Sequence, residues 1–295
     1  MTTQQDDWMT ELLASHPNIG RLCWFTVGDE PVDQHAWLQA IIQAGLAPYG
    51  WPHDIPATTA YLRGLHAMQR ATPTKTLLRC VERERGRSVH HWIQETVSGG
   101  QVQFTVLAAI ERQSRNDTLS IYRQTSLSSA DDAALSQLSE LIDTARHTYT
   151  PGDRRRQVRQ WLGSVGALHM EAAGPVQFVP DSAGGLLDAL TQAQADLGLN
   201  IWSMPLQRSQ DVIATLTQSL DADITQKTTA LLKRVHEARQ AGKTLSAHQQ
   251  TQLLEQFQSL DSRVQHYASL FGGQLTNLTT QIEVAKQALR QALAT

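Results

Sequence analysis

The stretch QAGKTLS, residues 240–246, ends like a phosphate-binding loop. Such a loop has the pattern GxxxxGK[ST] between a strand and a helix, because glycine backbone amides must surround the phosphate. Here Glu237 takes the place of the first glycine, and the residues before it have the apolar spacing of a helix. We therefore predict that Lys243 does not support nucleotide hydrolysis.

Other reactive side chains also lack the spacing that catalysis or metal binding requires. Ser164 lies in WLGSVG, where a nucleophile elbow would need glycine at the position that leucine occupies two residues earlier. His90 and His91 fall in an expected strand, so their side chains point to opposite faces. Cys23 and Cys80 do not form a CxxC pair. We expect no catalytic residue, no metal and no cofactor, whereas a pocket with converging carboxylates or histidines would indicate an enzyme.

A run of basic residues follows the helix-start signal TPGD at residues 150–153. It consists of Arg154, Arg155, Arg156 and Arg159. Cations at this end of a helix oppose the macrodipole, and a phosphate would compensate them. The formal net charge of -3 and the pI of about 6.4 argue against a protein that coats nucleic acid. We favour solvated arginines on an exposed helix start and keep nucleic-acid binding by these four residues as the alternative.

The same helix carries an apolar stripe beyond the arginines. Val158, Trp161, Leu162 and Val165 recur at helical spacing. We therefore expect Trp161 and Leu162 to point inward, at the junction between the first part of the chain and its C-terminal part.

The first half of the chain has the pattern of an α+β fold. Val102, Phe104, Val106, Ala108 and Ile110 alternate with the residues between them, as in a strand with one apolar face. Four strand-like runs joined by short turns predict an antiparallel β-meander, because parallel strands need long crossovers. The expected elements are a strand at 21–27, helices at 33–45 and 56–70, four strands within 76–125, and a helix at 128–149 that packs on the sheet.

From residue 209 onward the apolar spacing predicts long helices. Ser246 and Gln249 match a capping box at the start of the second one. Gly272 and Gly273 interrupt its heptad pattern, so we expect that helix to divide there. Its apolar stripe must be covered by the same chain, by a second copy or by another protein. The candidate partner-binding residues on this stripe are Leu253, Phe257, Leu260, Val264, Tyr267 and Phe271.

These patterns divide the chain into three consecutive parts. Residues 1–149 are expected to form an α+β head with an antiparallel sheet, 150–207 a small unit of helix and strand, and 208–295 a helical hairpin or coiled coil. A polar, acidic start, few cysteines and no apolar run of about 20 residues predict a cytoplasmic protein without membrane contact.

Four segments carry a resemblance to a known family. They are LCWFTV at 22–27, PATTAYLRGLHAM at 56–68, GPVQFVP at 174–180 and VQHYASLFGGQL at 264–275. In their order the chain resembles the family catalogued as domain of unknown function 6744, over nearly its whole length. The resemblance implies a role in a phage or another mobile element, defence included, and supplies no catalytic residues. We therefore expect a non-enzymatic interaction or assembly protein, with a nucleic-acid-binding accessory protein as the alternative.

Overall fold

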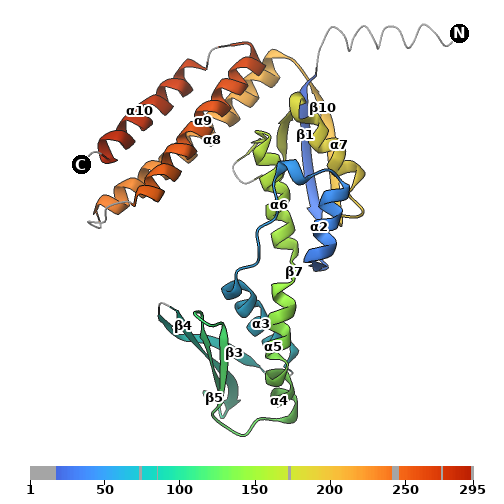
Figure 1. Cartoon of the computed structure of the whole chain (residues 1–295), viewed down its shortest axis with the longest axis vertical. Helices are drawn as coiled ribbons and strands as arrows, with labels where there is room; N and C mark the ends of the chain where they lie inside the picture. The colour runs from blue at the N-terminus through green and yellow to red at the C-terminus, as the bar shows by residue number, and fades with distance from the viewer. Residues whose placement is uncertain are drawn as a thin grey trace, which may run out of the picture. The chain divides into compact units, whose positions relative to one another are not determined.

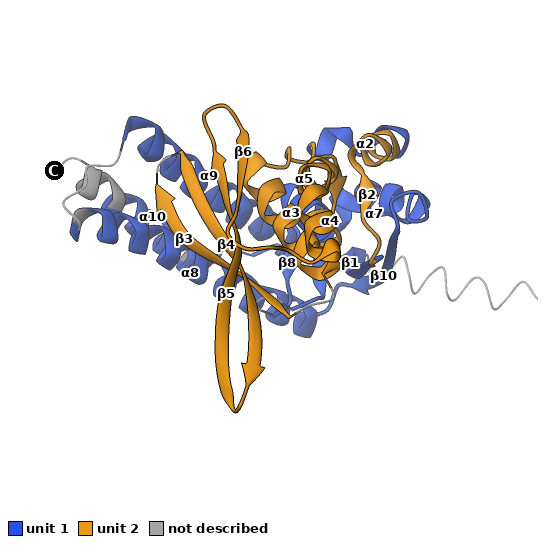
Figure 2. Ribbon diagram, turned by 90° about the horizontal axis from the view of Figure 1, so that it is seen from below, with its two compact units in different colours: residues 1–28, 42–50, 155–295 blue, residues 29–41, 51–154 orange. Residues whose placement is uncertain are grey.

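The computed structural model describes residues 18–72, 75–84, 86–171, 174–240, 246–273 and 275–293, so Lys243 lies outside the described residues. The chain forms two compact units, each built from segments that are distant in sequence (Figure 2). Unit 1 takes in the described residues of 1–28, 42–50 and 155–295, and unit 2 those of 29–41 and 51–154. This division differs from the three consecutive parts expected from the sequence, because the first strand pairs with strands that lie more than 140 residues later.

Unit 2 contains a sheet whose four antiparallel strands follow one another in sequence and in space. Leu65 and Leu138, from two different helices, are buried in one cluster with Trp92 and Ile110 of the sheet. The expected α+β meander is thus confirmed. Its elements are α3 (Ala57–Ala71), β3 (Thr76–Glu84), β4 (Arg87–Ser98), β5 (Gln101–Gln113), β6 (Thr118–Arg123), α4 (Ser129–Ser136) and α5 (Leu138–Arg146), with a small ladder of β2 (Val32–Asp33) and β7 (Thr148–Tyr149) and the helix α2 (Gln34–Gln43).

The helix expected at 128–149 is two helices, α4 and α5, which meet at Gln137. The Ser128 side chain caps α4 by accepting a hydrogen bond from the Asp131 amide. Helix α5 packs closely on α3 at Gly64, where an added Cβ would lie 2.5 Å from Ile142 Cγ1. A larger residue at position 64 would therefore push the two helices apart.

Unit 1 contains a second antiparallel sheet, in the strand order β10-β1-β9-β8. Strand β1 (Asn18–Val27) pairs with β10 (Leu199–Gln207) on one side and with β9 (Gln177–Pro180) on the other, and β9 also pairs with β8 (Leu168–His169). Cys23 and Val179 are buried, as are Leu186 and Leu190 of the neighbouring helix α7. The remaining elements of this part are η1 (Ala47–Tyr49), α6 (Pro151–Ser164), η2 (Asp181–Ala183) and α7 (Gly184–Gln192).

Three long helices complete unit 1 and lie side by side (Figure 1). They are α8 (Gln210–Gln240), α9 (Ala247–Phe271) and α10 (Thr276–Leu293). The expected capping box of Ser246 and Gln249 starts α9. Gly272 ends it in the left-handed conformation, at φ 68°, which glycine adopts without strain. The division of the second long helix at Gly272 is therefore confirmed.

Candidate interaction surface

The sheet of unit 2 has one face covered by helices and a second face, here called the outer face, that is more open. Trp92 lies on the covered face, in the same core cluster as helices α3 to α5. Neighbouring side chains of a strand point to opposite faces, so His91 and Ile93 lie on the outer face. Through the strand register, Leu77 and Tyr122 share that face with them. Both are substantially exposed.

The outer face continues onto a two-stranded ribbon, here called the ribbon, formed by residues 95–105 of β4 and β5. Figure 2 shows this hairpin extending beyond the rest of the sheet. The pairs Glu95–Phe104 and Val97–Val102 lie on the outer face. Val97 is 69% exposed, Phe104 63% and Val102 50%. Large apolar side chains with this exposure, gathered on one face, are typical of a contact surface.

A β-bulge decides which side chains reach this face. Trp92 pairs with Ala108, but the next residue, Ile93, pairs with Val106, so Leu107 is inserted as an extra residue. An inserted residue reverses the alternation beyond it. Ala108 and Ile110 are therefore in the core, whereas Val106, Phe104 and Val102, every second residue toward the tip, lie on the outer face. The alternation seen in the sequence does not mark a single face of the strand.

The opposite end of the outer face is charged and internally paired. The Arg87 guanidinium donates to Glu111, with Nε 2.9 Å from Oε1, and also to Glu82. The hydrogen bond from Arg87 holds the pKa of Glu111 below its ordinary value. Glu95, at the base of the ribbon, is likewise paired with Lys75 at 2.8 Å. The uncharged part of the outer face is therefore the ribbon tip, from Thr96 to Phe104.

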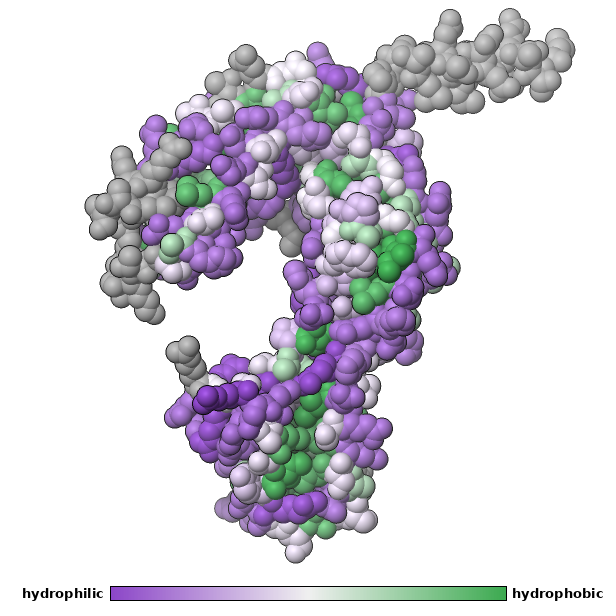
Figure 3. Space-filling model, in the orientation of Figure 1, coloured by the Kyte–Doolittle hydropathy of each residue, from purple (hydrophilic) through white to green (hydrophobic). Residues whose placement is uncertain are grey.

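The six residues of the expected partner-binding stripe are all buried inside unit 1. They belong to one apolar cluster with Leu216 and Leu220 of α8 and Ile282 of α10. Where it is described, the visible face of these helices is mostly hydrophilic in Figure 3. The stripe is therefore covered by the chain's own helices and sheet, and its six residues are not exposed to a partner in this structure. They are Leu253, Phe257, Leu260, Val264, Tyr267 and Phe271.

The four arginines of the basic run differ in their exposure to solvent: the first is buried and the other three are exposed. Arg154 is 2% exposed, its guanidinium lies 5.7 Å from the centre of the Trp37 ring, and its Nη2 donates to the Glu30 carbonyl at 2.5 Å. The expectation of an exposed Arg154 is wrong, because the first turn of α6 places this side chain in the interior of unit 2. Arg155, Arg156 and Arg159 are exposed.

Three of the four residues of the expected α6 stripe are buried, whereas Val165 lies beyond the end of α6 and is partly buried. Trp161 and Leu162 have no exposed surface. The indole Nε1 of Trp161 donates to the Gly50 carbonyl at 2.7 Å, which satisfies its buried polar atom.

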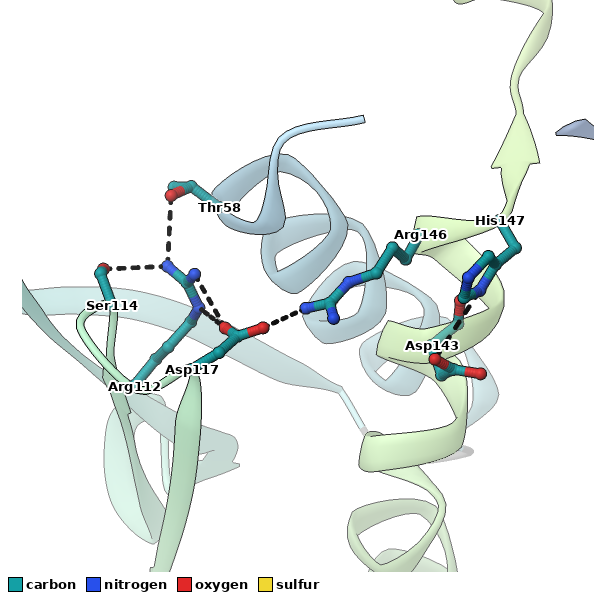
Figure 4. A network of polar contacts seen from close by, with 7 residues as sticks. All are labelled: Thr58, Arg112, Ser114, Asp117, Asp143, Arg146 and His147. Atoms are coloured by element: carbon teal, nitrogen blue, oxygen red, sulfur yellow. Dashed lines mark hydrogen bonds and ion pairs between the residues drawn. The ribbon is translucent and has the colours of Figure 1, made fainter. Parts of the chain in front are cut away.

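A polar network holds the β5–β6 turn of unit 2 to its helices (Figure 4). Asp117 accepts hydrogen bonds from Arg112, at 3.0 Å from Nε, and from Arg146. The Arg146 contact lowers the pKa of Asp117, with help from Arg112 and against the effect of burial. Arg112 also donates to Thr58 and Ser114, at 3.2 and 3.1 Å. One carboxylate thus engages both arginines beside an adjoining cavity of about 160 Å³, and the contacts tie the turn to helices α3 and α5.

A second, larger hollow of about 320 Å³ lies against α8 and carries His169, Glu171 and Asp223 in its lining. Asp223 is already paired with Lys227 at 2.8 Å and with Arg263 at 2.9 Å. Among the described residues, no three of His, Cys, Asp and Glu are grouped to hold a metal ion.

One further exposed aromatic feature lies on the sheet of unit 1. Trp24 and Trp202 form a cross-strand pair with ring centres 6.3 Å apart and planes at 14°. Both are at least one-third exposed, and Met204 lies beside them on the same face. The neighbouring side chains on the same face of β1 and β10 are uncharged, so the two tryptophans and Met204 form a small apolar patch.

The comparison with family models decides the relationship of the chain. A model described as "Family of unknown function (DUF6744)" matches residues 18–295. The chain belongs to the DUF6744 family. The resemblance carried by the four sequence segments is thereby confirmed. No curated protein and no solved structure gave a significant match to this DUF6744 protein.

None of the described helices of this DUF6744 protein is both long and apolar enough to span a membrane. The outer face of the unit 2 sheet was not among the surfaces predicted from the sequence. The available signal was the uncharged stretch TVSGGQVQFTV at residues 96–106, which places apolar residues on a hairpin with a Gly-Gly turn.

Proposed function

We propose that this DUF6744 protein is a non-enzymatic interaction or assembly protein, acting in the cytoplasm in a phage or other mobile-element system. The observation that carries the proposal is the exposed apolar outer face, with Val97, Val102 and Phe104 on its ribbon. Leaving such side chains in water costs about 25 cal/mol for each Å² of apolar surface, and a partner removes that cost. We place the contact on this face, rather than on the helical stripe, because the stripe is already covered within the chain.

The experiment compares the wild type with two variants of the same ribbon. Phe104→Lys puts a positive charge on the outer face of the ribbon. Gln103→Lys puts the same charge one residue away, on the other face of the ribbon. Tagged protein would be expressed in its native host, and captured proteins would be identified after nuclease treatment. We expect Phe104→Lys to lose the captured partner and Gln103→Lys to retain it. An identical set of captured proteins for all three forms, with the untagged copy of the same chain counted among them, would contradict the proposal.

A second candidate function is nucleic-acid binding, favoured by one observation. Arg155, Arg156 and Arg159 remain exposed within little more than one turn of α6. We propose that these three residues, without Arg154, contact phosphates if nucleic acid is bound. Each phosphate contact contributes about -0.7 for a single strand and -0.9 for a duplex to the slope of log affinity against log salt.

The test of this second candidate is the salt dependence of binding to single- and double-stranded oligonucleotides. Changing all three arginines to Ala should flatten the slope by about two to three units. Arg123→Ala, a change of an exposed arginine in unit 2, serves as the matched control. If no binding is measured at low salt, this candidate is dropped.

A further inference from the structure

We infer that the ribbon binds a second copy of the same chain, so that two ribbons pack their apolar faces together. This inference rests on the proposed function, because it names the partner of the same surface. The contact would be symmetric, with Val97, Val102 and Phe104 of one copy against the same residues of the other.

The apolar face of the ribbon tip is not covered by a third strand or a helix in the part of the chain that the structure describes. Among the pairings that the structure describes, Thr96 to Ser98 pair only with Gln101 to Gln103, so the tip has two strands and no third. A two-stranded hairpin is marginally stable in water unless one face packs against something. The tip is nevertheless a regular ladder, with Gly99 and Gly100 at positive φ in its turn. A regular ladder with an uncovered apolar face is what we expect where association with another molecule covers that face.

The edges of the ribbon are not protected against pairing. Natural proteins guard open edges with charged side chains, especially lysine, with proline or with short strands. Residues 96–106, TVSGGQVQFTV, contain no charged residue and no proline. Other open strands of the chain are guarded: β10 has Pro205, and β3 has Arg79, Glu82 and Arg83. The ribbon tip thus lacks the charged and proline residues that keep other open strands from associating with another chain.

The absence of charged residues at the ribbon tip also favours a second copy of the chain as the partner. A symmetric dimer places each residue of a patch opposite the same patch, so a charged patch would repel its own copy. The ribbon tip carries no charge, and its apolar face is therefore compatible with itself. Nucleic acid requires cations at the contact, and residues 96–106 contain none. A second copy is thus the occupant that fits this surface without any further complementary group.

The test uses the full-length protein and analytical ultracentrifugation over a wide range of concentrations. We expect the wild type and Gln103→Lys to show a monomer–dimer equilibrium. Phe104→Lys should weaken it by roughly 30-fold or more, as for loss of a central contact residue. A circular dichroism spectrum of each variant confirms that it is folded.

A crosslinking experiment tests the same contact without a charge. In a Cys80→Ser background, which removes the exposed cysteine, Val97→Cys places a thiol on the apolar face and Thr96→Cys places one on the other face. Mild oxidation should yield a covalent dimer for Val97→Cys and little for Thr96→Cys. Cys23 is buried and serves as the internal blank.

Two outcomes would overturn the inference, and they differ in what they imply for the proposed function. A wild type that stays monomeric, and gives no crosslink, but still loses a captured protein on Phe104→Lys has a different protein as its partner. A monomer whose captured proteins do not change on Phe104→Lys has no partner at the ribbon, and both proposals then fail.

Discussion

The stripe of α9 and the outer face of the β3–β6 sheet are both regular apolar patterns, but only the stripe is covered by the chain itself. Phe257 of the stripe has no exposed surface, whereas Phe104 of the ribbon is 63% exposed. The two phenylalanines have the same chemistry and differ in what surrounds them. The comparison teaches that an apolar pattern identifies a surface that must be buried, and only the packing identifies whether the chain or a partner buries it.

The largest expected effect separates these two phenylalanines. Phe257→Ala should lower the free energy of unfolding by about 3–5 kcal/mol, because it removes a fully buried aromatic side chain and leaves a cavity. Phe104→Ala, measured on the monomer at low concentration, should change it by less than about 0.5 kcal/mol, as for an exposed residue. Urea denaturation of both variants makes the comparison. Equal losses of stability would mean that Phe104 is also covered within the chain.

A smaller effect is expected within the basic run. Arg154→Ala should destabilise the protein by about 2 kcal/mol, since it removes a charged hydrogen bond to the Glu30 carbonyl and a contact with the Trp37 ring. The matched variant is Arg155→Ala, one residue further along α6 and exposed. Thermal unfolding of the two variants would sharpen the contrast between a buried and a solvated arginine of the same helix. If Arg155→Ala destabilises the protein more than Arg154→Ala does, Arg154 is not the arginine with the structural role.

The next effect depends on pH and concerns the covered face of the unit 2 sheet. Burial, with smaller contributions from Arg83 and His66, holds the pKa of His90 below its ordinary value of 6.5. The folded state then binds its proton less readily than the unfolded state. His90 therefore contributes stability that is fully present above about pH 6.5 and is lost as the pH falls through the lower folded pKa.

The measurement for this prediction is the free energy of unfolding between pH 7.5 and about pH 5. His90→Gln should flatten the decline over this range, because glutamine keeps a polar partner for the Tyr61 hydroxyl, which lies 3.1 Å from His90 Nδ1. His35→Gln, for which the changed residue is exposed in α2, is the control. An undiminished decline in His90→Gln would assign the acid sensitivity to other groups.

The smallest expected effect is on stability when the exposed arginines are removed together. Arg155, Arg156 and Arg159 are exposed on α6 beyond its first turn, where the helix dipole acts only weakly on them. Changing all three to Ala should alter the free energy of unfolding by no more than about 0.5 kcal/mol, since exposed charges contribute little. A chemical denaturation curve would check this. A large loss would show that these residues have a structural role, like Arg154.

Much of the local structure follows from the sequence alone. Ser246 with Gln249 starts α9 and Gly272 ends it, because capping groups and positive φ are properties of residues next to each other in the chain. The four-strand meander is predictable for a similar reason, since tight turns leave antiparallel pairing of neighbours as the only choice. The apolar stripe of α9 is also evident, as periodicity depends on residue type and spacing.

Tertiary structure decided where these elements go and which of their faces remain open. Strand β1 pairs with β9 and β10, and no local signal in residues 18–27 selects partners so far along the chain. Arg154 is buried and Arg155 is exposed because the first turn of α6 places the Arg154 side chain against Glu30 and Trp37. The single extra residue at Leu107 reverses the ribbon, so that Phe104 points away from the core that Ile110 enters. A bulge changes every side chain beyond it, and its position depends on how two strands fit together, which the spacing within one strand does not contain.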